Sequence, residues 1–206
     1  LLAGEDCFTI SNAFLHDDIQ VVNPLFQGFA PYHPPLVYDD YVAWLQLADS
    51  TLPARTKIVL GHRTHDIVEK HGLFLRREVH YLYLGAGSQS TDLMRPILSP
   101  QTGPILLLPL LIYMGYERVY LLGCDSTVLR DYGKTLQNFY RSDQDARTNS
   151  NTHWSDLATE MRGTIASLDQ FKYYADIVAG TSTSITNLSV DSWLEVFPFE
   201  RLEKIM

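Results

Sequence analysis

Cysteine is scarce in this chain, with only Cys7 and Cys124 among 206 residues. The two lie far apart in apolar, strand-like segments, a setting typical of buried, reduced thiols. No cysteine and histidine spacing of a zinc site is present, and two distant cysteines cannot hold a metal without histidine ligands. The sequence therefore predicts reduced thiols and no metal site.

Long hydrophobic runs are also missing. The longest, residues 105–114, has about half the length that a membrane span needs. No signal-peptide pattern is present. The chain has no initiator methionine and begins abruptly at Leu1 and Leu2, so we expect a missing upstream segment.

Clusters of basic residues are lacking too. Lysine and arginine number 16 against 24 acidic residues, which gives a formal net charge of -8. Sequence-independent binding to nucleic acid needs clustered positive charge, so this function class is excluded. The 46% hydrophobic content and the length fit one soluble globular domain over residues 1–206.

Apolar segments alternate between strand-like and helix-like patterns along the chain. The order predicts a doubly wound α/β fold: a mostly parallel, Rossmann-like sheet with helices on both faces. Residues 28–35 read as a proline-rich loop and residues 181–188 as a Ser/Thr loop. The expected strands are residues 7–11, 57–60, 79–84, 119–122 and 177–179, and the expected helices are residues 39–48, 64–71, 103–114 and 154–174.

Residues 100–127 indicate both the fold class and the position of a ligand-binding site. Thr102 is expected to cap a helix with its side chain, Pro104 lies in the first turn, and Gly115 ends the helix. Residues 119–122 then read as a strand buried on both faces, followed by Asp125. Ligands bind at the carboxyl ends of such strands, and the helix start at Thr102 and Gly103 could face an anion.

Polar groups elsewhere suggest transfer chemistry. Asn12 follows the first strand, as Asp125 follows a central one. Tyr132 and Tyr140 lie in the polar segment 125–151, where phenol groups could donate hydrogen bonds to a departing phosphate. His153 precedes the long helix and could act as a general base. Helix capping, aromatic packing and a plain surface histidine are the competing interpretations.

Other motifs are weaker. Residues 85–88 (GAGS) follow a strand, but neither the dinucleotide nor the P-loop pattern is completed. His62 and His65 lack an obvious third metal ligand. No Gly-x-Ser-x-Gly motif is present, so hydrolase chemistry with a serine nucleophile is not expected.

The stretch TGPILLLPLLIYMGYERVYLLGCD resembles the central motif of bacterial sialyltransferases that use CMP-sialic acid. It equally resembles the 6-hydroxymethylpterin diphosphokinase-like proteins of polysaccharide synthesis. DCFTISNAFLHDDI looks like the second strand of these families and SWLEVFPFERL like their closing segment, so the resemblance touches most of the chain.

The resemblance implies a nucleotide site and a metal-free single displacement. Asn12 and Asp125 would contact the nucleotide, and Thr102 and Gly103 would line the donor pocket. Tyr132 and Tyr140 would hydrogen-bond the leaving phosphate, and His153 would be the general base. No cofactor is implied beyond the nucleotide-sugar donor, with a CMP-sugar among the candidates.

Two departures from the family pattern leave the donor open. The leading strand and its Gly-x-Gly-Pro-Ser loop are absent and are expected upstream, and Ser99, Pro100 and Gln101 stand where sialyltransferases carry an arginine. We therefore expect a cytoplasmic glycosyltransferase whose acceptor is an oligosaccharide or lipid-linked glycan. A peripheral position at the inner membrane and an oligomeric state are left open.

Two other functions remain open. A pterin pyrophosphokinase would use ATP and magnesium, with Asp125, Asp131, Asp143 and Asp145 as the available carboxylates. A binding or assembly module could have kept the fold after losing the phosphate loop. The missing glycine-rich motif favours that module, whereas His153 and the tyrosines favour an enzyme.

Overall fold

The computed structural model describes residues 4–33, 36–134, 139–147 and 156–205. It is a mixed α/β protein that contains a parallel sheet of four strands with flanking helices. The chain forms two compact units, which are described separately: unit 1 comprises residues 1–84 and 137–154, and unit 2 comprises residues 85–136 and 155–206. Whether they form the single domain expected from the sequence stays a prediction.

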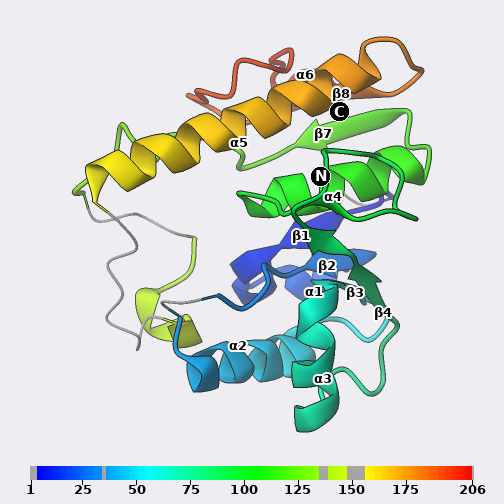
Figure 1. Ribbon diagram of the computed structural model, residues 1–206, viewed down its shortest axis with the longest axis vertical. Coiled ribbons are helices and arrows are strands. Elements are labelled where there is room, and N and C mark those ends of the chain that lie inside the picture. The colour runs from blue at the N-terminus through cyan, green and yellow to red at the C-terminus, as the bar shows by residue number, and fades with distance from the viewer. Residues whose placement is uncertain (1–3, 34–35, 135–138, 148–155, 206) are drawn as a thin grey trace. The chain divides into compact units, whose positions relative to one another are not determined.

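Unit 1 is built on the four-stranded sheet, whose strands are all parallel and follow the order β1-β2-β3-β4. Figure 1 shows α2 and α3 on the same side of these strands. The elements are β1 (Phe8–Ile10), η1 (Ser11–Leu15), α1 (Ile19–Val22), β2 (Phe26–Gly28), α2 (Tyr38–Thr51), β3 (Lys57–Gly61), η2 (His62–Thr64), α3 (His65–His71), β4 (Val79–Leu82) and η3 (Ser142–Gln144).

The core of unit 1 forms where α2 packs on β3. Tyr41, Trp44, Leu45 and Ala48 recur at helical spacing and are all buried. They join Ile58 and Leu60 of β3, Val68 of α3 and other apolar side chains in one cluster. The sequence prediction of a helix at residues 39–48 is therefore confirmed, and its apolar stripe is the face that covers the sheet.

Arg77 holds the carboxyl end of α2. Its guanidinium group is buried, pairs with Asp49 at 2.9 Å and donates to the carbonyls of Asp49, Leu52 and Pro53. The last carbonyls of a helix have no partner within the helix, and a cation there also complements the helix dipole. Arg77 thus supplies a partner for one of them, the carbonyl of Asp49, and for the carbonyls of the two residues that follow α2.

Unit 2 contains a second parallel pair of strands, β7 and β8, together with the longest helix, α5. α5 packs against α4 and β8 (Figure 1). The elements are β6 (Ile97–Leu98), α4 (Gly103–Tyr113), β7 (Arg118–Leu121), α5 (Leu157–Val178), β8 (Ser184–Asn187) and α6 (Leu202–Ile205), and the short β5 (Leu84–Gly85), which pairs with β6, spans the boundary between the units.

The end of α4 confirms the expected role of Gly115. Gly115 has a φ of +78° and donates to the carbonyl of Ile112, while the N–H of Tyr116 donates to Leu111. These two hydrogen bonds form a Schellman motif, which favours glycine because a left-handed backbone costs other residues more. The start is as predicted in position, with Thr102 at the N-cap, but its side chain makes no capping hydrogen bond.

Several elements correct the sequence predictions. β7 alternates between exposed and buried residues and Leu122 is 56% exposed, so this strand is not buried on both faces. Residues 177–179 end α5 instead of forming a strand, and the last described strand is β8, within the predicted Ser/Thr loop. β2 lies at the start of the predicted proline-rich loop.

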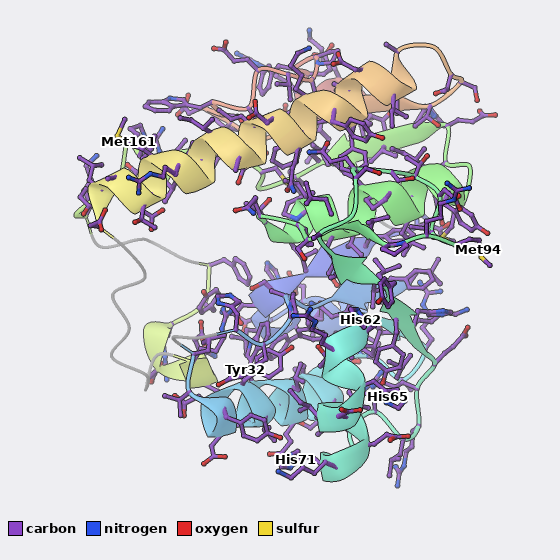
Figure 2. All side chains as sticks on the ribbon, in the orientation of Figure 1. Tyr32, His62, His65, His71, Met94 and Met161 are labelled. Carbon is purple, nitrogen blue, oxygen red and sulfur yellow. The ribbon has the colours of Figure 1, made fainter. Side chains whose placement is uncertain are left out.

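The apolar side chains of α5 are buried only in the second half of the helix. Phe171, Tyr174 and Val178 are buried, whereas Leu157, Met161 and Ile165 are about half exposed. Figure 2 shows Met161 near the first turns of this helix, directed outward. No helix among the described residues is long and apolar enough to cross a membrane.

Candidate functional site

A cavity of about 220 Å³ lies within unit 2, at the carboxyl end of β7. Three segments form its walls: the first turn of α4, the loop after β7, and one face of α5. The lining residues are Thr102, Pro104, Gly123, Cys124, Asp125, Ser126, Thr127, Val128, Thr164, Ser167, Leu168 and Phe171.

Hydrogen bonds to its backbone groups hold the loop after β7 in place. The N–H of Cys124 donates to Ser189 Oγ at 2.7 Å, and the N–H of Trp193 donates to the carbonyl of Asp125 at 2.7 Å. Gly123 and Ser126 have positive φ angles of 72° and 54°, which turn the chain sharply on both sides of Asp125. The backbone of Asp125 is therefore held in place while the residue itself is exposed to solvent.

The start of α4 is held by a side chain from α5. Gln170 is buried, accepts the N–H of Gln101 at 2.9 Å and donates to the carbonyl of Ser99 at 3.0 Å. The loop that leads into Thr102 is thereby tied to the helix that forms the opposite wall. The first turn of a helix leaves backbone N–H groups without intrahelical partners. Pro104 has no N–H group, so this wall offers the positive end of the helix dipole and fewer donors than most helix starts.

The wall formed by α5 carries two hydroxyl groups that the sequence analysis did not single out, Thr164 and Ser167. They interrupt the apolar face that continues to Phe171, and this break in the pattern is the signal that could have identified them. Cys124 also lines the cavity, and burial, with a smaller effect of Asp125, raises its pKa to about 12. Its thiol is therefore protonated at neutral pH.

Three of the predicted nucleotide-binding residues meet at this cavity. Thr102 and Asp125 line it, and Gly103 lies between the lining residues Thr102 and Pro104 at the start of α4. They are separated in sequence by the whole of α4 and β7, so the fold brings them together. Their predicted contact with a nucleotide stays a prediction.

Tyr132 lies in the turn that continues from the lining residues Thr127 and Val128, and it is 44% exposed. Basic residues surround it in the sequence: Arg130 and Lys134 both pair with Asp131, at 2.8 and 3.2 Å. These hydrogen bonds hold the pKa of Asp131 well below its usual range. The side chain of Tyr132 is therefore available to solvent on a turn that is fixed by charge pairs.

Asn12 belongs to unit 1 and is only 3% exposed. Its amide oxygen accepts the indole N–H of Trp44 at 2.6 Å, and its amide nitrogen donates to Asp145 at 2.6 Å. Asp145 also pairs with Arg147 at 3.0 Å, and the Arg147 guanidinium lies 4.1 Å from the Trp44 ring centroid. A nucleotide contact by Asn12 would require one of these hydrogen bonds to be exchanged.

The remaining predicted catalytic residues are not placed at the cavity. Tyr140 belongs to unit 1, where it contacts Phe139, which in turn packs against His16. His153, the proposed general base, lies outside the described residues. The roles of both stay predictions.

The histidines after β3 are held by separate partners. Figure 2 shows His62, His65 and His71 spread along η2 and α3. His62 Nδ1 accepts the N–H of Leu84 and the ring stacks on Tyr83 at 4.2 Å, whereas His65 lies near Asp66 and Glu69. Within the described ranges, no group of three or more His, Cys, Asp and Glu side chains could hold a metal ion.

Gly87, in the segment after β4, allows a close backbone approach. A Cβ atom on Gly87 would lie 2.3 Å from the carbonyl oxygen of Pro96, which is too short for any side chain. This approach lets Ser88 accept the N–H of Leu98 beside the pairing of β5 with β6. The segment that resembles a phosphate loop therefore has a structural reason for one of its glycines.

Comparison of the chain with protein-family models, with curated proteins and with solved structures finds no match in any of the three. We therefore infer the function from the geometry of the cavity and from the sequence motifs.

Proposed function

We propose that this protein is a glycosyltransferase, sialyltransferase-like in mechanism, that transfers a sugar from a nucleotide donor to a glycan acceptor. The observation that carries the proposal is the cavity at the carboxyl end of β7, where Thr102 and Asp125 meet. A cleft at the end of a parallel strand, beside a helix N-terminus, is a common site for nucleotides in α/β proteins. A doubly wound, Rossmann-like arrangement is the finer fold that this proposal includes.

The lining residues suit a nucleotide with few charges. The carboxylate of Asp125 can accept hydrogen bonds from ribose hydroxyls or a base amino group. The first turn of α4 can place the positive end of its dipole beside a phosphate, with the N–H of Gly103 as a candidate donor because Pro104 has none. None of the described lining residues is a lysine or arginine, which favours a donor with one phosphate over a diphosphate.

The proposed reaction is a single displacement. His153 would take the proton from an acceptor hydroxyl while that oxygen forms a bond to the anomeric carbon, and the bond from that carbon to the phosphate oxygen would break. Tyr132 or Tyr140 would donate a hydrogen bond to the leaving phosphate, whose negative charge grows as the bond breaks. The acceptor would be an oligosaccharide or lipid-linked glycan, handled in the cytoplasm or at the periphery of the inner membrane.

The first test is a binding screen against CMP, UDP, GDP and ATP, each with and without magnesium, by thermal shift and calorimetry. A ligand that binds only the folded state raises the melting temperature by mass action. We expect a metal-independent shift with a sugar-carrier nucleotide, CMP first, that is weakened by Asp125→Asn. Asp176→Asn, at an exposed position of α5 paired with Lys172, is the matched control and should bind like the unmodified protein.

Other outcomes would replace the proposal. A shift only with ATP and magnesium would indicate the pyrophosphokinase, although three of its four candidate carboxylates are paired with arginine or lysine: Asp131, Asp143 and Asp145. No shift with any nucleotide would favour the binding or assembly module.

A further inference from the structure

Among the described residues, one that lines the cavity carries a polar atom without a hydrogen-bond partner. The hydroxyl oxygen of Thr164, on α5, is buried from solvent and makes no hydrogen bond. Thr164 is also one of the residues that line the cavity. Buried polar groups are almost always hydrogen-bonded, so an unpaired one beside a cavity needs an explanation.

A second hydroxyl on the same helix, that of Ser167, forms the hydrogen bond that Thr164 lacks. Ser167 lies one turn later, lines the same cavity, and donates to the carbonyl of Gly163 at 2.9 Å. This contact to the residue four positions earlier is the usual solution for serine and threonine within a helix. Thr164 has the corresponding carbonyl, that of Glu160, on the preceding turn but does not bond it.

The surroundings of Thr164 indicate the group that it would bind. The α4 wall begins at Thr102, whose side chain makes no capping hydrogen bond, so the first N–H groups of α4 lack the usual side-chain partner. The positive end of the α4 dipole favours negative charge at this wall. A threonine hydroxyl is a neutral donor that can add one hydrogen bond to an anion without adding a charge.

We propose that Thr164 is a ligand-binding residue that donates a hydrogen bond to an anionic oxygen of the nucleotide-sugar donor. The inference rests on the proposed function, because it takes the donor as the ligand of this cavity. The anionic oxygen belongs either to the phosphate or to a carboxylate on the sugar, and both present the same hydrogen-bond acceptor. The unbound protein keeps the hydroxyl unpaired, and the ligand satisfies it.

The test uses Thr164→Val, which keeps the shape of the side chain and removes the hydroxyl. Thr164→Ser restores the hydroxyl, and Asp176→Asn, at an exposed position of the same helix, is the control. For each variant, the unfolding free energy of the unbound protein is measured in urea. Calorimetry then gives the affinities for CMP, UDP and GDP, for the matching nucleosides, and for CMP-sialic acid.

We expect Thr164→Val to unfold at the same or a higher urea concentration than the unmodified protein, because a buried group without a partner is removed. Its affinity for the bound nucleotide should nevertheless fall roughly 10- to 100-fold, the loss of a hydrogen bond to a charged group. Thr164→Ser should regain most of that affinity, and Asp176→Asn, outside the cavity, should change it less than about threefold. A purely structural role would not separate stability from affinity in this way.

The ligand series identifies the acceptor. A loss for the nucleotides but not for the nucleosides assigns the contact to the phosphate, and a loss for CMP-sialic acid alone assigns it to the sugar carboxylate. If Thr164→Val binds both the nucleotides and CMP-sialic acid as tightly as the unmodified protein does, the inference is wrong while the proposed function stands. If the unmodified protein binds none of the nucleotides or CMP-sialic acid, the proposed function and this inference both fail.

Discussion

Two strand ends in this protein start from the same sequence pattern and acquire different environments. Asn12 and Asp125 each follow a short strand with a polar side chain, and the sequence predicts a nucleotide contact for both. Asn12 becomes part of a buried network with Trp44 and Asp145, whereas Asp125 stays exposed at a cavity. The sequence pattern thus predicts a polar residue at the end of a strand. Contacts from distant segments determine whether that residue is buried, which we call a closed strand end, or exposed, which we call an open one.

We expect the closed strand end, at Asn12, to contribute more to the stability of the fold than the open one. Asn12, Trp44, Asp145 and Arg147 come from three separate parts of the sequence and contact one another in a ring. Each side chain in such a network is satisfied only while the others are present. The open end at Asp125 has no comparable set of contacts, so its side chain can change without loss of packing.

The largest expected loss of stability follows from removing the carboxylate of Asp145 from the buried network. The side chains of Asp145 and Arg147 are 9% and 19% exposed, so Asp145→Ala leaves a mostly buried guanidinium without its carboxylate. We expect a loss of about 3 kcal/mol in the free energy of unfolding, measured by urea denaturation. Asp143→Ala is the control: its pair with Arg141 is exposed to solvent, so its loss should have a much smaller effect.

A comparable loss in both variants would contradict the network. It would show that the segment around η3 contributes through its general packing and not through the buried pair of Asp145 and Arg147.

The second-largest expected loss of stability comes from replacing the side-chain amide of Asn12. Asn12→Leu keeps the size of the side chain but removes the acceptor of the Trp44 indole N–H and one of the donors to Asp145, which keeps its pair with Arg147. We expect a loss of about 2 kcal/mol in the unfolding free energy and little change in nucleotide affinity. An unchanged stability together with a large loss of nucleotide affinity would instead mean that Asn12 is open to ligand and that both strand ends serve the same site.

The closed network should also depend on pH. Burial by itself raises the pKa of Asp145, but the hydrogen bonds and charge of Arg147 and the donor of Asn12 leave it below its usual value. A carboxyl with a depressed pKa stabilises the fold above its unfolded pKa, about 3.9, and that contribution is lost as the pH falls through the folded value. The difference in unfolding free energy between the unmodified protein and Asp145→Ala should therefore narrow below about pH 4. A difference that stays constant down to pH 3 would show that Asp145 is not the titrating group.

How far the sequence predicts these features depends on the range of the interactions. α2 and the end of α4 follow from local signals, a helical apolar stripe and a glycine with positive φ, and both are confirmed. β8 was missed because its buried residues, Ile185 and Asn187, give a weak alternation; Asn187 is buried through hydrogen bonds to Ser192 and Leu194. Its identity as a strand depends on the pairing with β7.

The same limit applies to the site. Thr102 and Asp125 could be predicted because both flank recognisable elements, and the fold places them at one cavity. The closure of Asn12 could not be predicted, because its partner Asp145 lies 133 residues away in a segment without a regular pattern. Thr164 was equally hidden, since an amphipathic helix commonly carries threonine and only the packed structure shows that its hydroxyl is unpaired.

The smallest expected effect on stability belongs to the open end, where it is paired with a functional loss. Asp125 has one long contact, from the N–H of Thr127 at 3.5 Å, so Asp125→Asn should change the unfolding free energy by less than about 0.5 kcal/mol. Its nucleotide affinity should fall about tenfold, because an amide replaces one of the two acceptor oxygens with a donor. Urea denaturation and calorimetry on the same sample separate the two quantities. A destabilisation as large as that of Asp145→Ala would show that Asp125 is closed in solution as Asn12 is, and the contrast between the two strand ends would be lost.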